Sequence, residues 1–489
     1  MGVPLIQETV GTQQLRFFRP RIAHLSSPVA KWAAEICMAI LIAISITAPA
    51  ITLRQGLPWV RLEQLLLPLI FAVYFWMLLA GMVRKTPFNI MFLVGAVYSC
   101  CILLSTVYGA DILGQPVILR DFYEIPKAWL PVFFFTLAYQ AKLDENALRR
   151  VLKFFGVAVA IICLYAIGQW FNLGWTRVLN IYYSGGEHID GGLARYRRVY
   201  STMGNSNVLG QLMTWSIVTF TMAALFKAGS RLRNILLAFA CLVALAMTGS
   251  RYGLITSSIG IIMIFLLPSS AGIKRRWVQI ALLLVLLPLF GWTVTTVATK
   301  NQATLDRLES LRDPLQTDSF RKRLDVLWQD AGADISRSPI LGLGPAKERF
   351  TDVFTDSEYL DVIKKFGAIG FLTYLLYYIF PLFFLCKGLR SSRTVAPFFE
   401  EFRPATFLAM RLSFVMGVTA LIMNIGESTF YNQLLQAFLW MWLGLGVSAA
   451  ESIASFARTG VPNLAARNHA ASSVIPVRPA WPPTFRQQV

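Results

Sequence analysis

The sequence predicts an all-α, polytopic membrane protein with about twelve transmembrane helices. Of its 489 residues, 56% are hydrophobic and only 15% are charged, and the mean hydropathy is +0.56. A soluble domain could not bury that much apolar surface. Uncharged apolar runs recur from Trp32 to Leu445 without the alternation of barrel strands. Helices, which satisfy their own backbone hydrogen bonds, are therefore the expected spanning elements.

Twelve apolar windows of about 20 residues can be placed along the chain, each long enough to cross a bilayer as a helix. They lie near residues 32–52, 62–81, 88–108, 122–140, 151–171, 205–226, 234–249, 252–269, 277–297, 367–386, 407–425 and 430–449. The first run lacks a small-residue cleavage site, so we interpret it as a retained helix and not as a signal peptide. The fourth starts with several charged residues and Pro126, and an interfacial beginning is an alternative there.

Lys and Arg are concentrated in alternate short loops, near residues 84–85, 142–150, 227–233, 274–276 and 387–393. The positive-inside rule places these loops in the cytoplasm and, with an even number of spans, both termini as well. The predicted organisation starts with a cytoplasmic segment at 1–31 and nine helices over 32–298, with an extracytoplasmic loop at about 172–204. A large extracytoplasmic loop with a helix follows at 299–366. Three helices over 367–450 and a cytoplasmic, disordered tail at 451–489 complete the chain.

Composition argues against several functional classes. The formal charge of +19 is spread over short loops, without a basic domain or an aromatic RNA motif, so nucleic acid is not an expected partner. The six cysteines show neither CxxC pairs nor metal-ligand spacing. The sequence contains no zinc motif, no Walker-type loop and no recognisable Ser-His-Asp set, and we expect neither a cofactor nor a metal. His188, in a Gly-rich stretch, is interpreted as a surface residue.

Positive charge on the first long loop departs from the topology rule. Arg195, Arg197 and Arg198 precede a small, polar stretch that contains Asn205 and Asn207 and then enters an apolar helix. Guanidinium forks beside a helix N-terminus are suited to binding phosphate oxygens. The alternative is that these arginines merely touch anionic lipid headgroups.

Two further basic groups are expected at the same face. Thr248-Gly249-Ser250-Arg251 interrupts two apolar runs so tightly that Arg251 should lie at the extracytoplasmic membrane edge, facing either a diphosphate or, by snorkelling, a lipid phosphate. Arg321, Lys322 and Arg323 begin an amphipathic helix predicted over 319–335, whose apolar face includes Trp328. Taken alone, that basic run is more typical of a solvated face.

Two carboxylates are expected at the level of the membrane surface, where the large loop ends. Asp356 and Glu358, beside Tyr359, lead from the large loop into the next helix. One of them could be a general base for a sugar hydroxyl, and helix capping is the alternative for both. Glu427, in the hairpin at 424–427, is either a partner for an arginine or a turn residue.

Taken in order, these motifs resemble those of the O-antigen ligase and O-antigen polymerase superfamily, over roughly residues 195–445. Arg198 followed by 201–207 resembles the family's Arg, Gly-Thr and Asn-Pro-Asn stretch, and Thr248–Arg251 resembles its Ser-Arg hairpin. In the large loop the family's order is followed by Arg321 or Arg323, Trp328, the Pro339–Gly344 segment, Tyr359, Leu360, Gly367 and Gly370.

The resemblance implies a metal-independent glycosyltransferase of the bacterial inner membrane. Its donor would be a glycan on undecaprenyl diphosphate, and an acceptor hydroxyl would attack the anomeric carbon. Arginines would stabilise the leaving diphosphate: Arg198, Arg251 and Arg321 or Arg323. Asp356 or Glu358 would be the candidate base, with Arg195, Arg197, Asn205, Asn207, Trp328 and Tyr359 contacting diphosphate or glycan. A chain-length regulator and a flippase are the expected protein partners.

Three activities are compatible with this pattern. Ligases of the family resemble one another in a His-Asn pair before the Tyr-Leu step, whereas this chain has Asp356-Ser357, which favours a polymerase of O-antigen, capsule or exopolysaccharide repeat units. Transfer of the glycan to lipid A-core is the first alternative. A transporter or flippase is the second, although such proteins usually carry ionisable residues near the midplane, and the apolar runs here are nearly free of charge.

Overall fold

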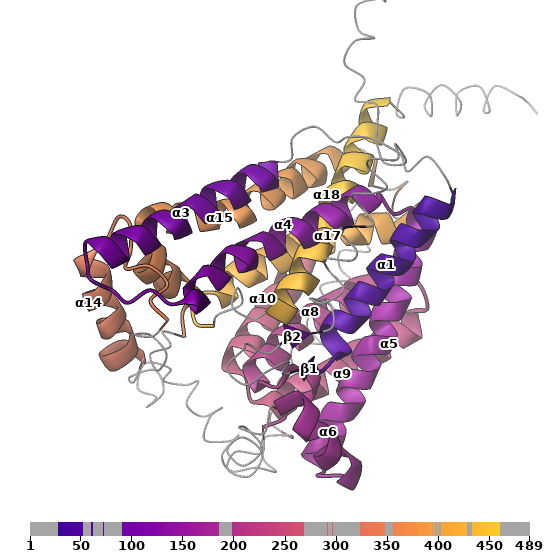
Figure 1. Cartoon of the computed structure of the whole chain (residues 1–489). Coiled ribbons are helices and arrows are strands. Elements are labelled where there is room, and N and C mark those ends of the chain that lie inside the picture. Colours follow the sequence, from indigo (N-terminus) through magenta and orange to yellow (C-terminus); the bar gives the residue numbers. More distant parts are fainter. Residues whose placement is uncertain are drawn as a thin grey trace, which may run out of the picture.

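The structure is a computed structural model that describes residues 28–51, 60–61, 72, 90–184, 198–267, 291, 296, 323–347, 356–393, 395–396, 399, 402–427 and 433–459. These residues form a bundle of helices (Figure 1). The longer helices are α1 (Pro28–Thr47), α3 (Ile90–Asp111), α4 (Glu124–Ala141), α5 (Glu145–Trp170), α6 (Gly174–Ser184), α8 (Ser206–Leu225), α9 (Arg231–Thr248), α10 (Arg251–Leu266), α14 (Gln329–Arg337), α15 (Glu358–Ser392), α17 (Pro404–Met423) and α18 (Gln433–Thr459).

Short elements connect the helices. Two 3₁₀ turns, η2 (Leu119–Tyr123) and η4 (Ser201–Met203), precede α4 and α8, and a π-helical turn, η6 (Arg323–Trp328), precedes α14. Within the described part of the chain, the strands are β1 (Ala50–Ile51) and β2 (Val60–Arg61), which form one antiparallel pair.

Seven of the described helices are long and apolar enough to cross a membrane: α3, α5, α8, α9, α15, α17 and α18. The predicted class, an all-α polytopic membrane protein, is therefore confirmed. Ten of the predicted helices overlap described ones, although α15 is longer at both ends. Helix α18 continues to Thr459, into the segment that was predicted to be a disordered tail from residue 451. The predicted helices at 62–81 and 277–297 lie almost entirely outside the described residues, which include only residues 72, 291 and 296 of them.

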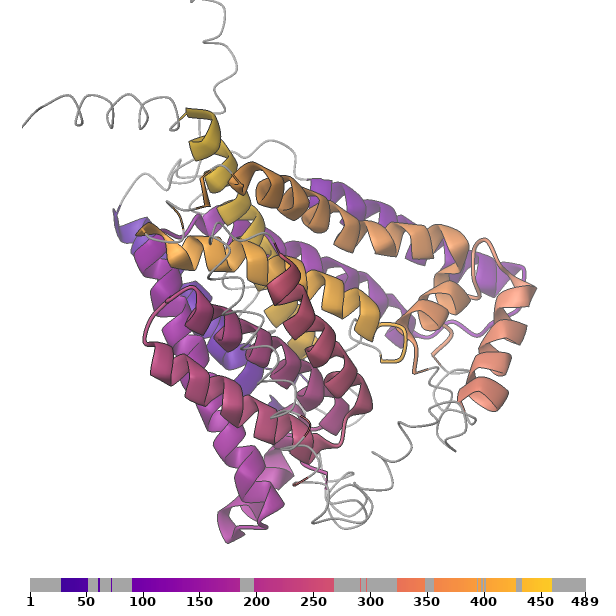
Figure 2. The same cartoon turned by 180° about the vertical axis from the view of Figure 1, so that it is seen from behind.

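The seam between α3 and α15 illustrates how the bundle is packed. The two helices lie side by side in opposite views (Figure 1, Figure 2). Tyr98 of α3 makes edge-on ring contacts with Phe366 and Tyr377 of α15, at centroid distances of 5.6 and 5.7 Å. Ring contacts with this fixed geometry hold the two helices together, because flexible lipid chains cannot form them.

Polar contacts show which helix ends lie on the same side. The Glu145 carboxylate accepts hydrogen bonds from the backbone N–H groups of Ala405 and Thr406, each at 2.9 Å, so α5 and α17 start together. Arg150 pairs with Glu35 of α1 on that side. We call it the basic end, because the described basic turns at 142–150, 227–233 and 387–393 lie there.

The opposite ends of the helices also meet. The Thr202 hydroxyl donates to the Ile46 carbonyl oxygen at 2.7 Å, and the Tyr359 hydroxyl donates to the Leu421 carbonyl oxygen at 2.6 Å. The ends of α1 and α17 therefore lie beside the starts of α8 and α15. We call this side the site end.

The start of α15 differs from the prediction. A helix was expected from residue 367, whereas α15 begins at Glu358 and is kinked at Gly367. The added turns are polar, and they can be buried because Asp361 pairs with Lys365 at 2.7 Å. Gly367 has φ +66°, and a Cβ there would lie 2.0 Å from the Ile340 carbonyl oxygen, so only glycine fits.

Candidate functional site

Arg198 lies at the site end, where the start of α8 meets the turn between α9 and α10. Its Nε donates a hydrogen bond to the Thr248 carbonyl oxygen at 2.7 Å, and a terminal nitrogen donates to Asn207 Oδ1 at 2.5 Å. Asn207 Nδ2 in turn donates to Glu427 Oε1 at 2.7 Å. The Arg198–Asn207–Glu427 chain joins two segments that are distant in sequence, and the bond to Thr248 adds a third. Together these bonds fix the orientation of the guanidinium.

Local sequence explains how Asn207 reaches this position. Asn205 is the N-cap of α8, and its Oδ1 accepts from the backbone N–H groups of Asn207 and Val208 at 2.8 and 3.4 Å. Gly204, with φ +69°, allows the sharp entry, because a Cβ would lie 2.5 Å from the Tyr183 carbonyl oxygen. Asn205 itself is exposed and is available at the surface of the site.

A buried glutamine holds the segment that follows Arg198. Gln169 Oε1, near the end of α5, accepts from the backbone N–H groups of Tyr200 and Ser201 at 3.2 and 2.7 Å. Its Nε2 donates to Asn180 Oδ1 of α6 at 2.6 Å, and the Tyr165 hydroxyl donates to the same oxygen at 2.7 Å. Because Gln169 is buried, these bonds are shielded from water and hold the segment firmly.

Arg251 is the first residue of α10 and is partly exposed. Gly249 ends α9 in the left-handed conformation, and the Ser250 hydroxyl caps α10 by accepting from the Gly253 N–H at 3.2 Å. The turn is pressed against α8, since a Cβ on Gly210 would lie 2.7 Å from the Ser250 Cβ. This sequence of caps places Arg251 three residues beyond the carbonyl that Arg198 binds.

The start of α15 completes the site end. The Glu358 N–H donates to the Asn424 carbonyl oxygen at 3.0 Å, in the same turn as Glu427. Asn424 Nδ2 donates to the hydroxyl groups of Tyr374 and Tyr378 at 2.8 and 3.2 Å. The turn at 424–427 therefore contacts both the Arg198 side and the α15 side.

The two candidate carboxylates differ in access. Glu358 is completely buried, whereas Asp356, just before the helix, is partly exposed. A base must come within hydrogen-bond reach of the hydroxyl that it deprotonates. Of the two, Asp356 has the more accessible position. Tyr359, the next residue after Glu358, is half-buried, and its hydroxyl binds the Leu421 carbonyl oxygen.

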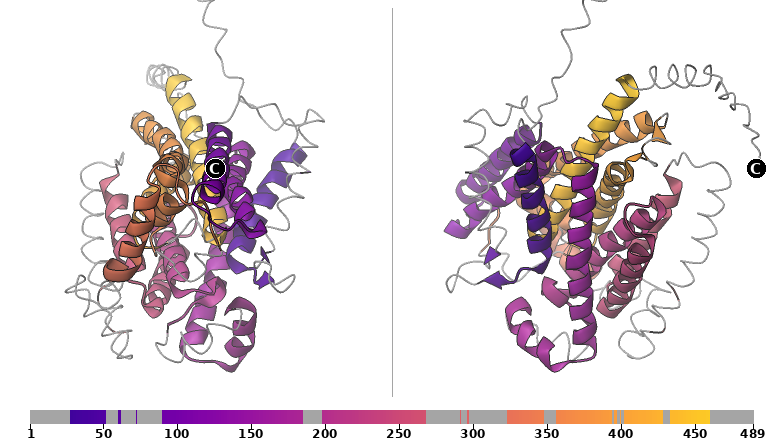
Figure 3. Two further views of the ribbon diagram at one scale, coloured as in Figure 1. Left: turned by 60° about the vertical axis from the view of Figure 1, so that its left-hand side comes forward. Right: turned by 90° about the vertical axis from the view of Figure 1, so that its right-hand side faces the viewer.

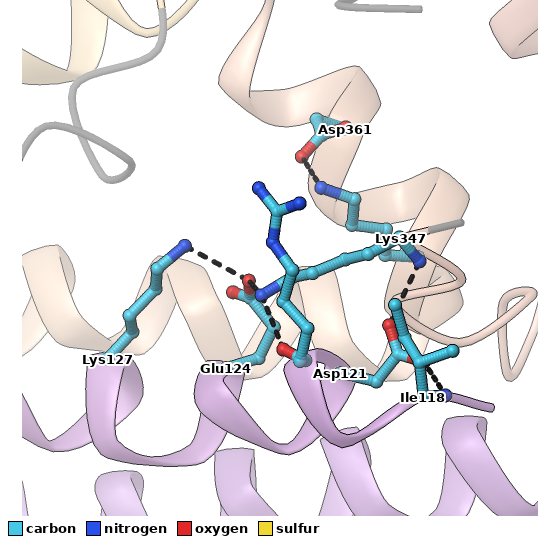
Figure 4. A network of polar contacts seen from close by, with 8 residues as sticks. Ile118, Asp121, Glu124, Lys127, Lys347 and Asp361 are labelled. Carbon is cyan, nitrogen blue, oxygen red and sulfur yellow. Dashed lines mark hydrogen bonds and ion pairs between the residues drawn. The ribbon is translucent and has the colours of Figure 1, made fainter. Parts of the chain in front are cut away.

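A network of ion pairs lies between α4, α15 and the segment at 338–347 (Figure 4). The Lys347 ammonium lies 2.7 Å from Glu124 Oε1, and the Lys127 ammonium lies 3.0 Å from the same oxygen. The Lys347 N–H also donates to Asp121 Oδ1 at 2.9 Å. Burial lowers the pKa of the Lys347 ammonium, although Glu124 beside it acts in the opposite direction.

Backbone hydrogen bonds fasten the same segment to α15. The N–H groups of Leu343 and Gly344 donate to the carbonyl oxygens of Lys364 and Lys365 at 3.0 and 2.9 Å. Gly109 of α3 allows the close approach on the other side, since a Cβ would lie 2.3 Å from the Leu343 carbonyl oxygen. Residues 338–347 are thus tied to the bundle by charges and by backbone contacts.

Residues 236–375 match the protein-family model described as O-antigen ligase. The resemblance to the O-antigen ligase and polymerase superfamily is confirmed. The matched segment includes Arg251, Asp356, Glu358 and Tyr359, whereas the Arg198–Asn207–Glu427 chain lies outside it. No curated protein matches the chain.

The protein is therefore a multi-pass membrane protein with an O-antigen ligase-like domain. The match over residues 236–375 supports a membrane enzyme of the O-antigen ligase or polymerase type.

The predicted site residues differ in where they lie. The structure brings Arg198, Asn207 and the Arg251 turn together by hydrogen bonds, and it joins Glu358 and Tyr359 to the neighbouring turn at 421–424. Trp328 ends η6, next to α14, which packs against α15. Arg323 begins η6, and nothing is described of its side chain. Three arginines and one histidine lie outside the described residues: Arg195, Arg197, Arg321 and His188.

Three residues of the site were missed or left undecided by the sequence. Glu427 was interpreted as either an arginine partner or a turn residue, and the structure connects it to Arg198 through Asn207. Gln169 and Asn424 were not singled out. The sequence feature that could have indicated them is an amide side chain at the end of an apolar run, because an amide that is buried there needs a hydrogen-bond partner.

Proposed function

We propose that this protein polymerises oligosaccharide repeat units carried on undecaprenyl diphosphate, at the extracytoplasmic face of the bacterial inner membrane. The observation that carries the proposal is the orientation of Arg198 by Thr248 and by Asn207, beside the Arg251 turn. The site end lies opposite the basic end, and the basic end is assigned to the cytoplasm by the positive-inside rule. Asp356-Ser357, in place of the His-Asn pair of ligases, favours polymerisation over ligation.

In this reaction an acceptor hydroxyl attacks the anomeric carbon of the donor glycan. The bond between that carbon and the diphosphate oxygen breaks, and the undecaprenyl diphosphate leaves with an additional negative charge. Arg198 and Arg251 would stabilise this charge, because guanidinium donors that are already oriented need no reorganisation when it develops. The hydroxyl proton passes to a carboxylate, for which Asp356 has the more accessible position.

We expect Arg251→Ala to abolish polymer formation while the protein is still inserted at its normal level. The residue lies in a capped turn whose own hydrogen bonds come from Ser250 and Thr248, so removal of the side chain should leave the turn folded. The measurement is the growth of polymer from purified lipid-linked repeat units by protein reconstituted in vesicles. Full-length polymer from this variant would show that Arg251 is not part of the site.

The same assay separates polymerase from ligase. Purified lipid A-core is added together with the lipid-linked repeat units, and the acceptor that is consumed is identified. Elongation of the lipid-linked units supports the polymerase. Transfer to lipid A-core alone would assign the protein to the ligase group instead.

Asp356→Asn should lower kcat and leave KM for the donor nearly unchanged, because the amide keeps the shape of the side chain and loses its basicity. A positioned general base contributes about 10²–10⁴-fold to rate, so the loss should lie in that range. Glu358→Gln is the comparison, since Glu358 is completely buried. If only Glu358→Gln reduced kcat, the base would be Glu358 and not Asp356.

A further inference from the structure

Helix α6 begins four residues after α5, one of the candidate membrane spans. Figure 3 shows it at the end of α5, at the lower edge of the bundle. The outward face of α5 carries large apolar side chains at helical spacing: Phe154, Val157, Ile161 and Leu164, all of them exposed. An exposed apolar stripe along a membrane span is the surface that faces lipid.

The apolar stripe continues past the end of α5. Six exposed apolar residues follow within the turn and α6: Phe171, Leu173, Trp175, Val178, Leu179 and Tyr182. Val178 is 60% exposed, which is as open as the lipid-facing positions of α5. The opposite face of α6 is packed on the protein, because Thr176 and Asn180 are buried. Water would be a poor environment for so many clustered apolar side chains.

The connection between α5 and α6 is tight. A Cβ on Gly168 would lie 2.7 Å from the Trp175 ring and 2.8 Å from the Thr176 methyl group, so the two helices meet closely at this glycine. The Leu173 N–H donates back to the Gly168 carbonyl oxygen at 3.0 Å. Helix α6 is therefore held against the end of α5, one of the candidate membrane spans.

We propose that the exposed face of α6 lies in the bilayer, at the boundary between acyl chains and headgroups. The occupant of this face is membrane lipid, because the face continues the lipid-facing stripe of α5. Trp175 and Tyr182 are residue types that favour this depth, and the exposed Arg177 between them can reach lipid phosphate.

Buried hydrogen bonds would couple the lipid contact of α6 to the position of the site. Asn180 of α6 binds Gln169, and Gln169 holds the backbone N–H groups of Tyr200 and Ser201, two and three residues after Arg198. The bilayer surface thus sets the depth of the segment that carries Arg198, which would match the guanidinium to a diphosphate at headgroup level. This last step rests on the proposed function, whereas the lipid contact of α6 does not.

The lipid contact is tested with the full chain in lipid nanodiscs. A ketone-bearing amino acid replaces Val178 and is spin-labelled, so the natural cysteines stay in place. Leu164, on the lipid-facing stripe of α5, and Asp330, exposed on α14, are labelled in the same way as references. Collision rates with oxygen, which concentrates in lipid, are compared with those of a water-soluble nickel complex.

We expect the label at 178 to favour oxygen, as at 164, and the label at 330 to favour nickel. A label at 178 that favours nickel would overturn the proposal. Low access to both reagents would also overturn it, because protein and not lipid would then cover the face.

A second measurement tests the coupling to the site. Val178→Asp should raise KM for the lipid-linked donor several-fold and leave kcat unchanged, since no group near the reacting atoms is altered. Asp330→Asn is the control, with both constants unchanged. Normal KM together with lipid contact at 178 would reject the coupling and leave the polymerase assignment intact.

Discussion

Arg198→Ala is expected to lower the rate of polymer formation by about 10²–10³-fold, the cost of removing one preorganised donor to developing negative charge. Arg198 is bound on one side by the Thr248 carbonyl oxygen and on the other by Asn207, so its position is fixed before substrate arrives. Arg198→Lys should recover only a small part of the rate, because an ammonium cannot reproduce the guanidinium fork. The rate is measured with reconstituted protein at saturating and limiting donor.

Two further variants show whether the loss comes from positioning. Asn207→Ala removes the support of Arg198 and should give an intermediate loss. Glu427→Gln keeps an oxygen that can accept from Asn207, and it should give the smallest loss. Arg393→Ala, which removes an exposed arginine at the basic end, should have no effect. A loss for Glu427→Gln as large as for Arg198→Ala would contradict an indirect role for Glu427.

Glu124→Gln is expected to destabilise the protein by about 3 kcal/mol, the low end of the cost of breaking a buried ion pair. Glu124 is almost fully buried and is the shared partner of the Lys127 and Lys347 ammonium groups. Neutralising it leaves two poorly solvated cations close together. The measurement is the thermal unfolding midpoint in nanodiscs, which should fall by several degrees.

The matched control is Asp330→Asn, which removes an exposed carboxylate from α14 and should leave the midpoint unchanged. The double variant Glu124→Gln with Lys347→Met should be more stable than Glu124→Gln alone, because one of the two uncompensated charges is removed. Equal midpoints for the single and double variants would show that the Lys347 charge is not destabilising when Glu124 is neutral.

The spans and the Arg251 turn could be predicted from the sequence because their signals are local. An apolar run of about 20 residues specifies a membrane helix by itself. The turn at 248–251 could be recognised because Gly249 and Ser250 are typical of a helix end and a helix start, and the structure uses them in those roles. The same reasoning failed at residues 358–366, since the charges there are neutralised by neighbours that the local sequence does not reveal.

Local sequence thus determined that this chain forms membrane helices, roughly where most of them lie, and which basic residues depart from the topology rule. Only the tertiary structure decided that Glu427 supports Arg198 through Asn207, that Gln169 holds the segment after Arg198, and that Lys347 is buried against Glu124. Helix formation depends on neighbours within a few residues, whereas each of these contacts joins segments far apart in the chain. Their partners are fixed only when the helices pack.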